Sequence, residues 1–283
     1  MSIIQGTSMA SAAGGYDVTN AIHLNASASQ YFSKTLGAGN TKTFTYFTMV
    51  RFGIDPGYQN SDQGAVLISA YRMSGYSDAI RCWWSGDASY TTNQARFAVD
   101  IDIVGANYGA NINPVIRDPS SWYVLAVAID TTQATAADRI KFWLGGIENG
   151  GGTKSAEPGG YPPLNHDLYL NSAVAHTIGN QATNLTYYAD MNFTEMGLID
   201  GSAIDGSTLT EVAANGEWRP IDNLAVVEAG GTNSFLLRTA DGVDASSKGN
   251  DWTPVNTPTD TADTPTNIYP VFNTLIPYMD STF

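Results

Sequence analysis

Hydrophobic and polar residues alternate along many short segments of the chain, which is the pattern of β-strands that bury one face. The alternation is clearest over residues 96–104. One face there carries Phe97, Val99, Ile101 and Ile103, and the other carries Arg96, Asp100 and Asp102. Comparable segments predict strands at residues 41–52, 64–71, 122–130, 139–144, 173–178, 186–199 and 234–238. Residues 122–130 are apolar on both faces, as is typical of a strand in the middle of a sandwich.

Turn-forming residues separate these segments, and helix signals are few. The sequence has 28 glycines and 12 prolines, which are the residues that most often form turns. Residues 208–211 (Thr-Leu-Thr-Glu) match a helix capping box and Gly216 follows them, so we expect one short helix there. Many short strands and little helix predict an all-β fold, a β-sandwich of the jelly-roll type.

The two ends of the chain differ in composition from its middle. Residues 1–20 are rich in Ala, Ser and Gly and are expected to form an N-terminal arm. Residues 253–283 carry five prolines among threonines and no Lys or Arg. Proline excludes a helix and a central strand, so we expect an extended C-terminal tail that lies on the sandwich or on a neighbouring copy. Residues 21–252 are then a single jelly-roll domain.

The charge balance excludes several classes of partner. Lys and Arg total 13 and Asp and Glu total 27, which gives a net charge of −14, whereas nucleic-acid binding needs clustered positive charge. No apolar run approaches the roughly 18 residues of a membrane span. Cys82 is the one cysteine, so a disulfide framework is excluded. The first residues lack the features of a secretory signal, and we expect synthesis in a cytoplasm.

A series of motifs in a fixed order resembles one protein family. It begins with residues 31–35 (Tyr-Phe-Ser-Lys-Thr), 39–45 (Gly-Asn-Thr-Lys-Thr-Phe-Thr) and 117–123 (Arg-Asp-Pro-Ser-Ser-Trp-Tyr). It continues through residues 130–139, 143–146, 176–179, 198–201, 217–220, 249–254 and 263–267. From about residue 22 to 270, the chain thereby resembles a family of tailed-phage virion proteins with a concanavalin A-like lectin/glucanase (LamG-like) jelly-roll domain.

The resemblance implies a virion location, a sandwich fold and no defined catalytic residues. We therefore expect a non-enzymatic structural or adhesive protein on the exterior of a tailed phage, as capsid decoration or as a tail-fibre component. Its expected partners are other capsid or tail proteins, further copies of the chain, with a trimer favoured, and a glycan of the host surface. The alternatives are a soluble lectin that binds host surface polysaccharide and, less favoured, a glycoside hydrolase that cleaves it.

Asp100 and Asp102 are the first candidates for site chemistry, because glucanases of this fold carry acids at alternating positions of one strand. Alternation puts both carboxylates on the same face, where a glycosidase needs two acids with distinct roles. No glutamate accompanies them, since the flanking positions hold Ala98 and Val104. We therefore expect a solvent-facing acidic surface, or a polar face that binds sugars by hydrogen bonds, rather than a catalytic pair.

Aromatic residues would add a stacking surface for a sugar ring. Trp83, Trp84, Tyr90, Tyr187 and Tyr188 are the candidates. Neighbours such as Trp83 and Trp84 point to opposite faces of a strand, so at most one of them serves the core. Packing against a loop or a partner is the alternative use of the outward residue.

We expect no cofactor, with a calcium ion as the one alternative. Lectin-like sandwiches often hold calcium in their loops, and this cation takes several oxygen ligands. Acidic loops lie near Asp55, Asp62, Asp87 and Asp205, but no Asp-x-Asp-x-Asp-Gly run selects one of them. Surface acids that favour solubility are the simpler interpretation.

Overall fold

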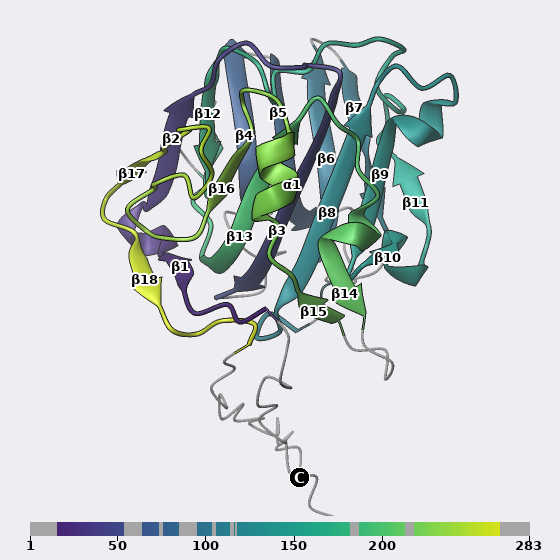
Figure 1. Cartoon of the computed structure of the whole chain (residues 1–283). Helices are drawn as coiled ribbons and strands as arrows, with labels where there is room; N and C mark the ends of the chain where they lie inside the picture. The colour runs from purple at the N-terminus through teal and green to yellow at the C-terminus, as the bar shows by residue number, and fades with distance from the viewer. Residues whose placement is uncertain are drawn as a thin grey trace, which may run out of the picture.

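Two antiparallel β-sheets packed face to face form the molecule in its computed structural model (Figure 1). The structure describes residues 16–53, 64–73, 76–84, 95–103, 106–113, 116, 118–181, 187–212 and 218–266. Sheet pairing is antiparallel throughout these residues, as expected where short turns join neighbouring strands.

The first sheet has the strand order β10-β9-β8-β3-β13-β1-β18, and β16 also pairs with β13. Its strands are β1 (Ala21–Leu24), β3 (Thr43–Phe52), β8 (Tyr123–Asp130), β9 (Ile140–Leu144), β10 (Ile147–Glu148), β13 (Met191–Asp200), β16 (Phe235–Leu237) and β18 (Thr259–Thr261).

The second sheet has the strand order β11-β7-β6-β5-β4-β12-β2-β17. Its strands are β2 (Tyr31–Thr35), β4 (Ala65–Met73), β5 (Tyr76–Trp84), β6 (Ala95–Ile103), β7 (Ala106–Ile112), β11 (Lys154–Ala156), β12 (Ala175–Ile178) and β17 (Thr253–Val255).

A few short elements complete the described chain. Strands β14 (Thr210–Val212) and β15 (Trp218–Pro220) pair with each other. The helical elements are α1 (Leu224–Ala229) and the 3-10 turns η1 (Ala26–Ala28), η3 (Ala136–Arg139), η4 (Asn149–Gly151) and η5 (Gly206–Leu209). No helix within the described ranges has the length and apolar character needed to cross a bilayer.

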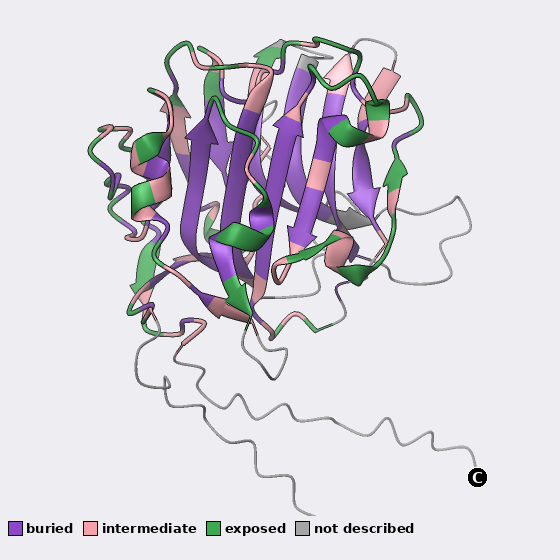
Figure 2. Ribbon diagram, turned by 45° about the vertical axis from the view of Figure 1, so that its right-hand side comes forward, coloured by how far each residue is buried: buried purple, intermediate pink, exposed green. Residues whose placement is uncertain are grey.

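Apolar side chains fill the space between the two sheets, and the strands that face it are buried along most of their length (Figure 2). In β6, Phe97, Val99 and Ile101 are fully buried in this core. The alternation predicted for this strand is therefore confirmed. So is the fold class, an all-β sandwich of the jelly-roll type.

Strand β8 is apolar on both faces because it lies between two apolar layers. Val127 faces the core between the sheets. Ala126 points outward into a second cluster with Trp143 and Val227. Val227 belongs to α1, which lies over the outer face of the first sheet in Figure 1. The central position predicted for this segment is confirmed, since β8 pairs with both β3 and β9.

The helix predicted for residues 208–216 is wrong. Asp205 instead caps the 3-10 turn η5 by accepting a hydrogen bond from Ser207 N at 3.0 Å. Thr210 then turns to an extended conformation, with φ −144°, because residues 210–212 pair with β15. Residues 213–217, which include the expected helix end, lie outside the described residues.

The first part of the expected C-terminal tail belongs to the sandwich. Strand β17 pairs with β2 at the edge of the second sheet, and β18 pairs with β1 at the edge of the first. Pro254 is tolerated in β17 because an edge strand pairs on one side only. Sandwich strands therefore extend past residue 252 to Thr261, and residues 1–15 and 267–283 lie outside the described residues.

Candidate functional site

Asp100 and Asp102 share the outer face of the second sheet, opposite Ala79 and Ser77 of β5. Asp100 is only 4% exposed, and its carboxylate forms an ion pair with Arg81 of β5. The expectation of a solvent-facing acid is therefore wrong for Asp100. The guanidinium that neutralises the Asp100 carboxylate comes from the neighbouring strand β5, so the register of β5 and β6 determines the environment of Asp100.

Two more acids on this face also have side-chain partners. Asp102 accepts a hydrogen bond from Ser77 Oγ at 3.1 Å, and partial burial raises the pKa of Asp102. Glu157, which follows β11, accepts from Asn111 Nδ2 at 3.0 Å. Burial and the nearby charge of Asp100 raise the pKa of Glu157. The face is thus a network of side chains that bind one another, and the sequence did not single out Glu157.

The aromatic candidates of the predicted sugar site come from the end of β5 and from residue 90. Trp83 and Trp84 end β5, where their backbone pairs with β6, and their side chains lie outside the description. Tyr90 lies outside the described residues altogether. Sugar binding by these three residues, and by Tyr187 and Tyr188, stays a prediction.

The expected calcium loops also fall largely outside the description. Asp55, Asp62 and Asp87 are not among the described residues, and Asp205 uses its carboxylate to cap η5. Across the described segments, no group of three or more His, Cys, Asp or Glu side chains could hold a metal ion.

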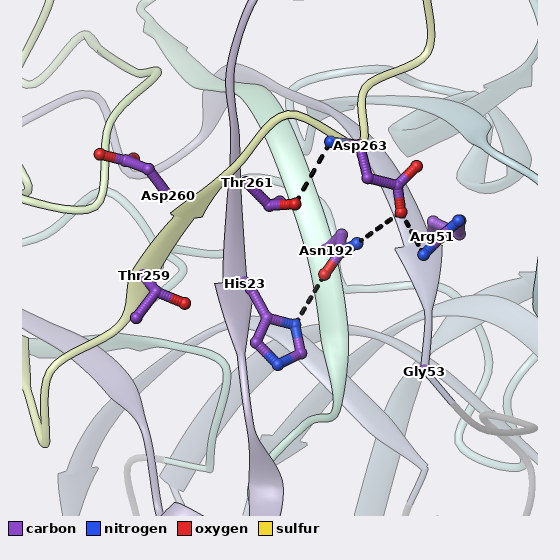
Figure 3. Close-up of a pocket in the computed structure, with 8 residues that line it drawn as sticks. All are labelled: His23, Arg51, Gly53, Asn192, Thr259, Asp260, Thr261 and Asp263. Atoms are coloured by element: carbon purple, nitrogen blue, oxygen red, sulfur yellow. Dashed lines mark hydrogen bonds and ion pairs between the residues drawn. The ribbon is translucent and has the colours of Figure 1, made fainter. Parts of the chain in front are cut away.

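A recess opens on the outer face of the first sheet, on the other side of the sandwich (Figure 3). Strand register builds it: His23 of β1 lies opposite Asn192 of β13 and Thr259 of β18, and Asn192 lies opposite Arg51 of β3. These four polar residues form one row across four neighbouring strands. Each flanking residue on β1, β3 and β13 is buried in the core, so the row points away from the core.

Asp263, in the segment after β18, closes one side of the recess. Its carboxylate forms an ion pair with Arg51 and accepts a hydrogen bond from Asn192 Nδ2 at 3.2 Å. Asn192 Oδ1 lies 2.7 Å from His23 Nδ1. Because a carboxylate only accepts, the amide of Asn192 turns its oxygen to His23, and His23 Nδ1 donates. In the neutral ring Nε2 is then an acceptor, and it faces away from Asn192 (Figure 3).

Residues of β18 complete the lining. Thr259 and Thr261 bring hydroxyl groups, and Thr261 Oγ1 accepts from Asp263 N at 3.2 Å. Asp260 also lines the recess, but its carboxylate turns toward Asn20, whose Nδ2 donates to Asp260 Oδ1 at 2.8 Å. The recess has a volume of about 370 Å³ and offers hydroxyl, imidazole and carboxylate groups to a ligand.

Sequence reasoning missed this recess for a physical reason. Its residues come from positions 23, 51, 192 and 259–263, and only the register of the folded sheet brings them together. The one available signal is a polar residue inside an apolar strand, such as His23 between Ile22 and Leu24. Asp263 lies in the segment that the sequence assigns to the tail.

No family model and no curated protein matches the chain. Among solved structures, domains LG4-5 of the mouse laminin α1 chain match with 8% identity and a TM-score of 0.40, over 64% of this chain and 41% of that one. Tailspike protein 2 of an Escherichia coli O157:H7 bacteriophage matches with 11% identity and a TM-score of 0.38, over 67% of this chain and 25% of that one.

A third similar structure is the CBM40 domain of a Ruminococcus gnavus sialidase bound to α2,3-sialyllactose. It matches with 10% identity and a TM-score of 0.37, over 62% of this chain and 90% of that one. The aligned region thus spans less than half of the laminin and tailspike chains. At such identities and TM-scores, no ligand or activity transfers from these proteins to this chain.

Proposed function

We propose that this protein is a non-enzymatic carbohydrate-binding module that serves as an adhesive protein on the exterior of a tailed-phage particle. The observation that carries the binding role is the row of four polar residues that lines the recess beside Asp263, namely Thr259, His23, Asn192 and Arg51. The row stands on paired strands of the sandwich rather than on loops. Its geometry is therefore set before a ligand arrives, which lowers the entropic cost of binding.

The polar groups of the recess match the chemistry of a saccharide. A sugar hydroxyl both donates and accepts hydrogen bonds, and the recess offers both roles. The hydroxyls of Thr259 and Thr261 can donate, and His23 Nε2 accepts when the ring is neutral. A volume of about 370 Å³ lies near the lower end of the roughly 300–1,000 Å³ that is usual for small-molecule sites. This size suits a short part of a saccharide chain.

Binding rather than cleavage is the role that the two acids of the recess favour. A glycosidase places two carboxylates on either side of the scissile bond. Asp263 is held by Arg51 and Asn192, whereas Asp260 turns toward Asn20 and accepts from Ala240 N at 2.8 Å. The two carboxylates therefore do not face each other across the recess (Figure 3).

The phage location rests on the motif series between residues 22 and 270 and on the sandwich fold. The protein would serve either as capsid decoration or as a tail-fibre component. Its partners would be other virion proteins and further copies of the chain, with a trimer favoured. Antibody labelling of intact particles, imaged by electron microscopy, distinguishes these two positions. Particles that carry no label would favour the alternative of a soluble lectin.

The binding role is tested with the whole protein on a broad glycan array, followed by calorimetric titration of the best ligand. We expect His23→Ala to weaken binding about tenfold, because a hydrogen bond to a ligand contributes on the order of 1.4 kcal/mol. His166→Ala is the matched control, since His166 is a half-buried histidine between β11 and β12 and does not line the recess.

Equal affinities of the two variants would contradict the recess as the binding site. An array on which the wild-type protein retains no glycan would contradict the binding role itself. In that case the sandwich would act through protein contacts alone.

A further inference from the structure

We infer that the recess selects sugars rich in hydrogen-bond donors, either uncharged or amino-bearing, and rejects acidic sugars. This inference rests on the proposed carbohydrate-binding function and specifies the chemical class of the ligand. It follows from two properties of the lining residues, their charge balance and their unmatched acceptor.

The charge balance of the lining is negative. Arg51 is the one basic residue among the lining residues besides His23, and Asp263 already holds its guanidinium in an ion pair. Asp260 adds a second carboxylate at the rim. The two carboxylates of the lining outnumber its one guanidinium, which leaves an excess of negative over permanent positive charge. A ligand carboxylate or sulfate would meet this charge without a free cation to pair with, and like charges at close range repel.

The unmatched hydrogen-bonding group that a ligand in the recess can reach is an acceptor on His23. Asp263 Oδ2 already faces Arg51 and Asn192, and Asp263 Oδ1 is buried, so neither carboxylate oxygen is free for a ligand. His23 Nε2 points away from Asn192 (Figure 3), and no described residue donates to it. Unmatched acceptors favour a ligand that brings donors. An acidic group would bring further acceptors instead.

Two kinds of sugar supply donors without negative charge. A neutral sugar offers its hydroxyls, and an amino sugar adds an ammonium group with three donors and a positive charge. The ammonium would also offset the excess negative charge that Asp260 and Asp263 leave. We therefore expect an amino sugar to bind at least as tightly as its N-acetylated counterpart, and both to bind more tightly than any acidic sugar.

The test titrates the whole wild-type protein with four probes at neutral pH. Cello-oligosaccharides and N-acetylchito-oligosaccharides are the neutral probes, chitosan oligosaccharides are the amino probe, and oligogalacturonides are the acidic probe. We expect binding to at least one neutral or amino probe and at least tenfold weaker binding to the acidic one. Raising the salt concentration should lower the affinity for the amino probe more than the affinity for the neutral probes.

Asp263→Asn tests the role of charge, because it replaces one carboxylate oxygen by an amide group and removes one negative charge. The variant keeps the side-chain shape and releases the Arg51 guanidinium from its ion pair. We expect it to gain at least tenfold in affinity for oligogalacturonides and to lose affinity for the amino probe. Asp138→Asn is the matched control, because Asp138 is a half-exposed acid whose ion pair with Lys141 (3.8 Å) lies outside the recess.

Asp260→Asn provides a second variant if Asp263→Asn does not fold. It removes one negative charge and leaves the ion pair of Arg51 in place, so it should lower affinity for the amino probe and reduce the difference in affinity between the amino and acidic probes. Tighter binding of the acidic probe by the wild-type protein, or no response of charge preference to either variant, would overturn the inference and leave the proposed function intact. Binding of no carbohydrate in these titrations or on the glycan array would overturn both.

Discussion

Asp78 and His176 are buried ionisable residues whose pKa values shift in opposite directions on folding. Burial raises the pKa of Asp78 to about 7, although the carboxylate accepts hydrogen bonds from Tyr169 N and Leu170 N that favour its charged form. Burial lowers the pKa of His176 to about 4. In both residues the protein interior disfavours the charged form.

These two groups change the stability of the fold with opposite signs over the same pH range. Between about pH 4 and 7, folded Asp78 keeps its proton and the unfolded chain loses it, so the free energy of unfolding falls as pH rises. Over nearly the same range, folded His176 is neutral while the unfolded chain is protonated. Its contribution therefore rises with pH. The two effects largely cancel in the wild-type protein.

Asp78→Asn should uncover this cancellation. The variant lacks the Asp78 contribution, which lowers the free energy of unfolding of the wild type as pH rises. The free energy of unfolding of the variant relative to the wild type should therefore increase from pH 4 to pH 7. An increase on the order of 4 kcal/mol corresponds to a pKa change from 3.8 to about 7. Urea unfolding at a series of pH values measures it, with Asp118→Asn at an exposed turn as control. A stability difference that is independent of pH would show that Asp78 does not titrate in this range.

At the scale of elements, the turn before β17 depends on one glycine. Gly242 has φ +79°, and its carbonyl accepts a hydrogen bond from Trp252 N at 2.7 Å. A Cβ at position 242 would lie 2.0 Å from Trp252 O. Trp252 itself is buried against Phe235, with ring centroids 5.1 Å apart. This contact fixes the point from which the chain enters β17 and then β18, which carries one wall of the recess.

Gly242→Ala should therefore destabilise the fold by about 2–4 kcal/mol, from the left-handed backbone and the clash with Trp252 O together. Gly249→Ala is the matched control. Gly249 also has a positive φ of +71°, but a Cβ there meets nothing within 4 Å, so only the backbone cost of about 1–2 kcal/mol applies. Denaturant unfolding compares the two variants. Equal losses would mean that the close approach to Trp252 O is absent in solution.

Strands such as β6 and β8 could be predicted from the sequence because their signal is local, whereas strands such as β1, β5 and β7 were not predicted. The alternation in β6 and the apolar faces of β8 are properties of nine or fewer consecutive residues. The helix prediction failed at Thr210 because the partner strand β15 overrides a capping pattern. The prolines of the C-terminal segment correctly excluded a central strand, but they did not show that β17 and β18 would be edge strands.

The environment of each candidate site residue could not be predicted in the same way. Asp100 lies on the outer face that the alternation predicts, yet its burial depends on Arg81 of the neighbouring strand. The recess depends on the register of β18, β1, β13 and β3. The local sequence of one strand does not show which residue of a distant strand it will pair with. His23 and Asn192 therefore look like isolated polar residues in the sequence.

At the scale of the whole molecule, the recess lies where the first and last described segments meet. Val18 N donates to Thr266 Oγ1 at 3.0 Å, and Thr266 Oγ1 donates to Val18 O at 2.9 Å. Asn20 Nδ2 bridges Arg238 O and Asp260 Oδ1, each at 2.8 Å. The row of polar residues thus combines both ends of the described chain with two central strands. The candidate site is a property of the complete sandwich.

The measurement that tests this account most directly is a chemical-shift map of the isotope-labelled whole protein, titrated with the best glycan from the array. We predict that the largest changes occur at His23, Asn192 and Thr259, including the side-chain amide of Asn192. Changes centred on Asp100 and Glu157, on the outer face of the second sheet, with His23 unaffected, would contradict the recess as the binding site.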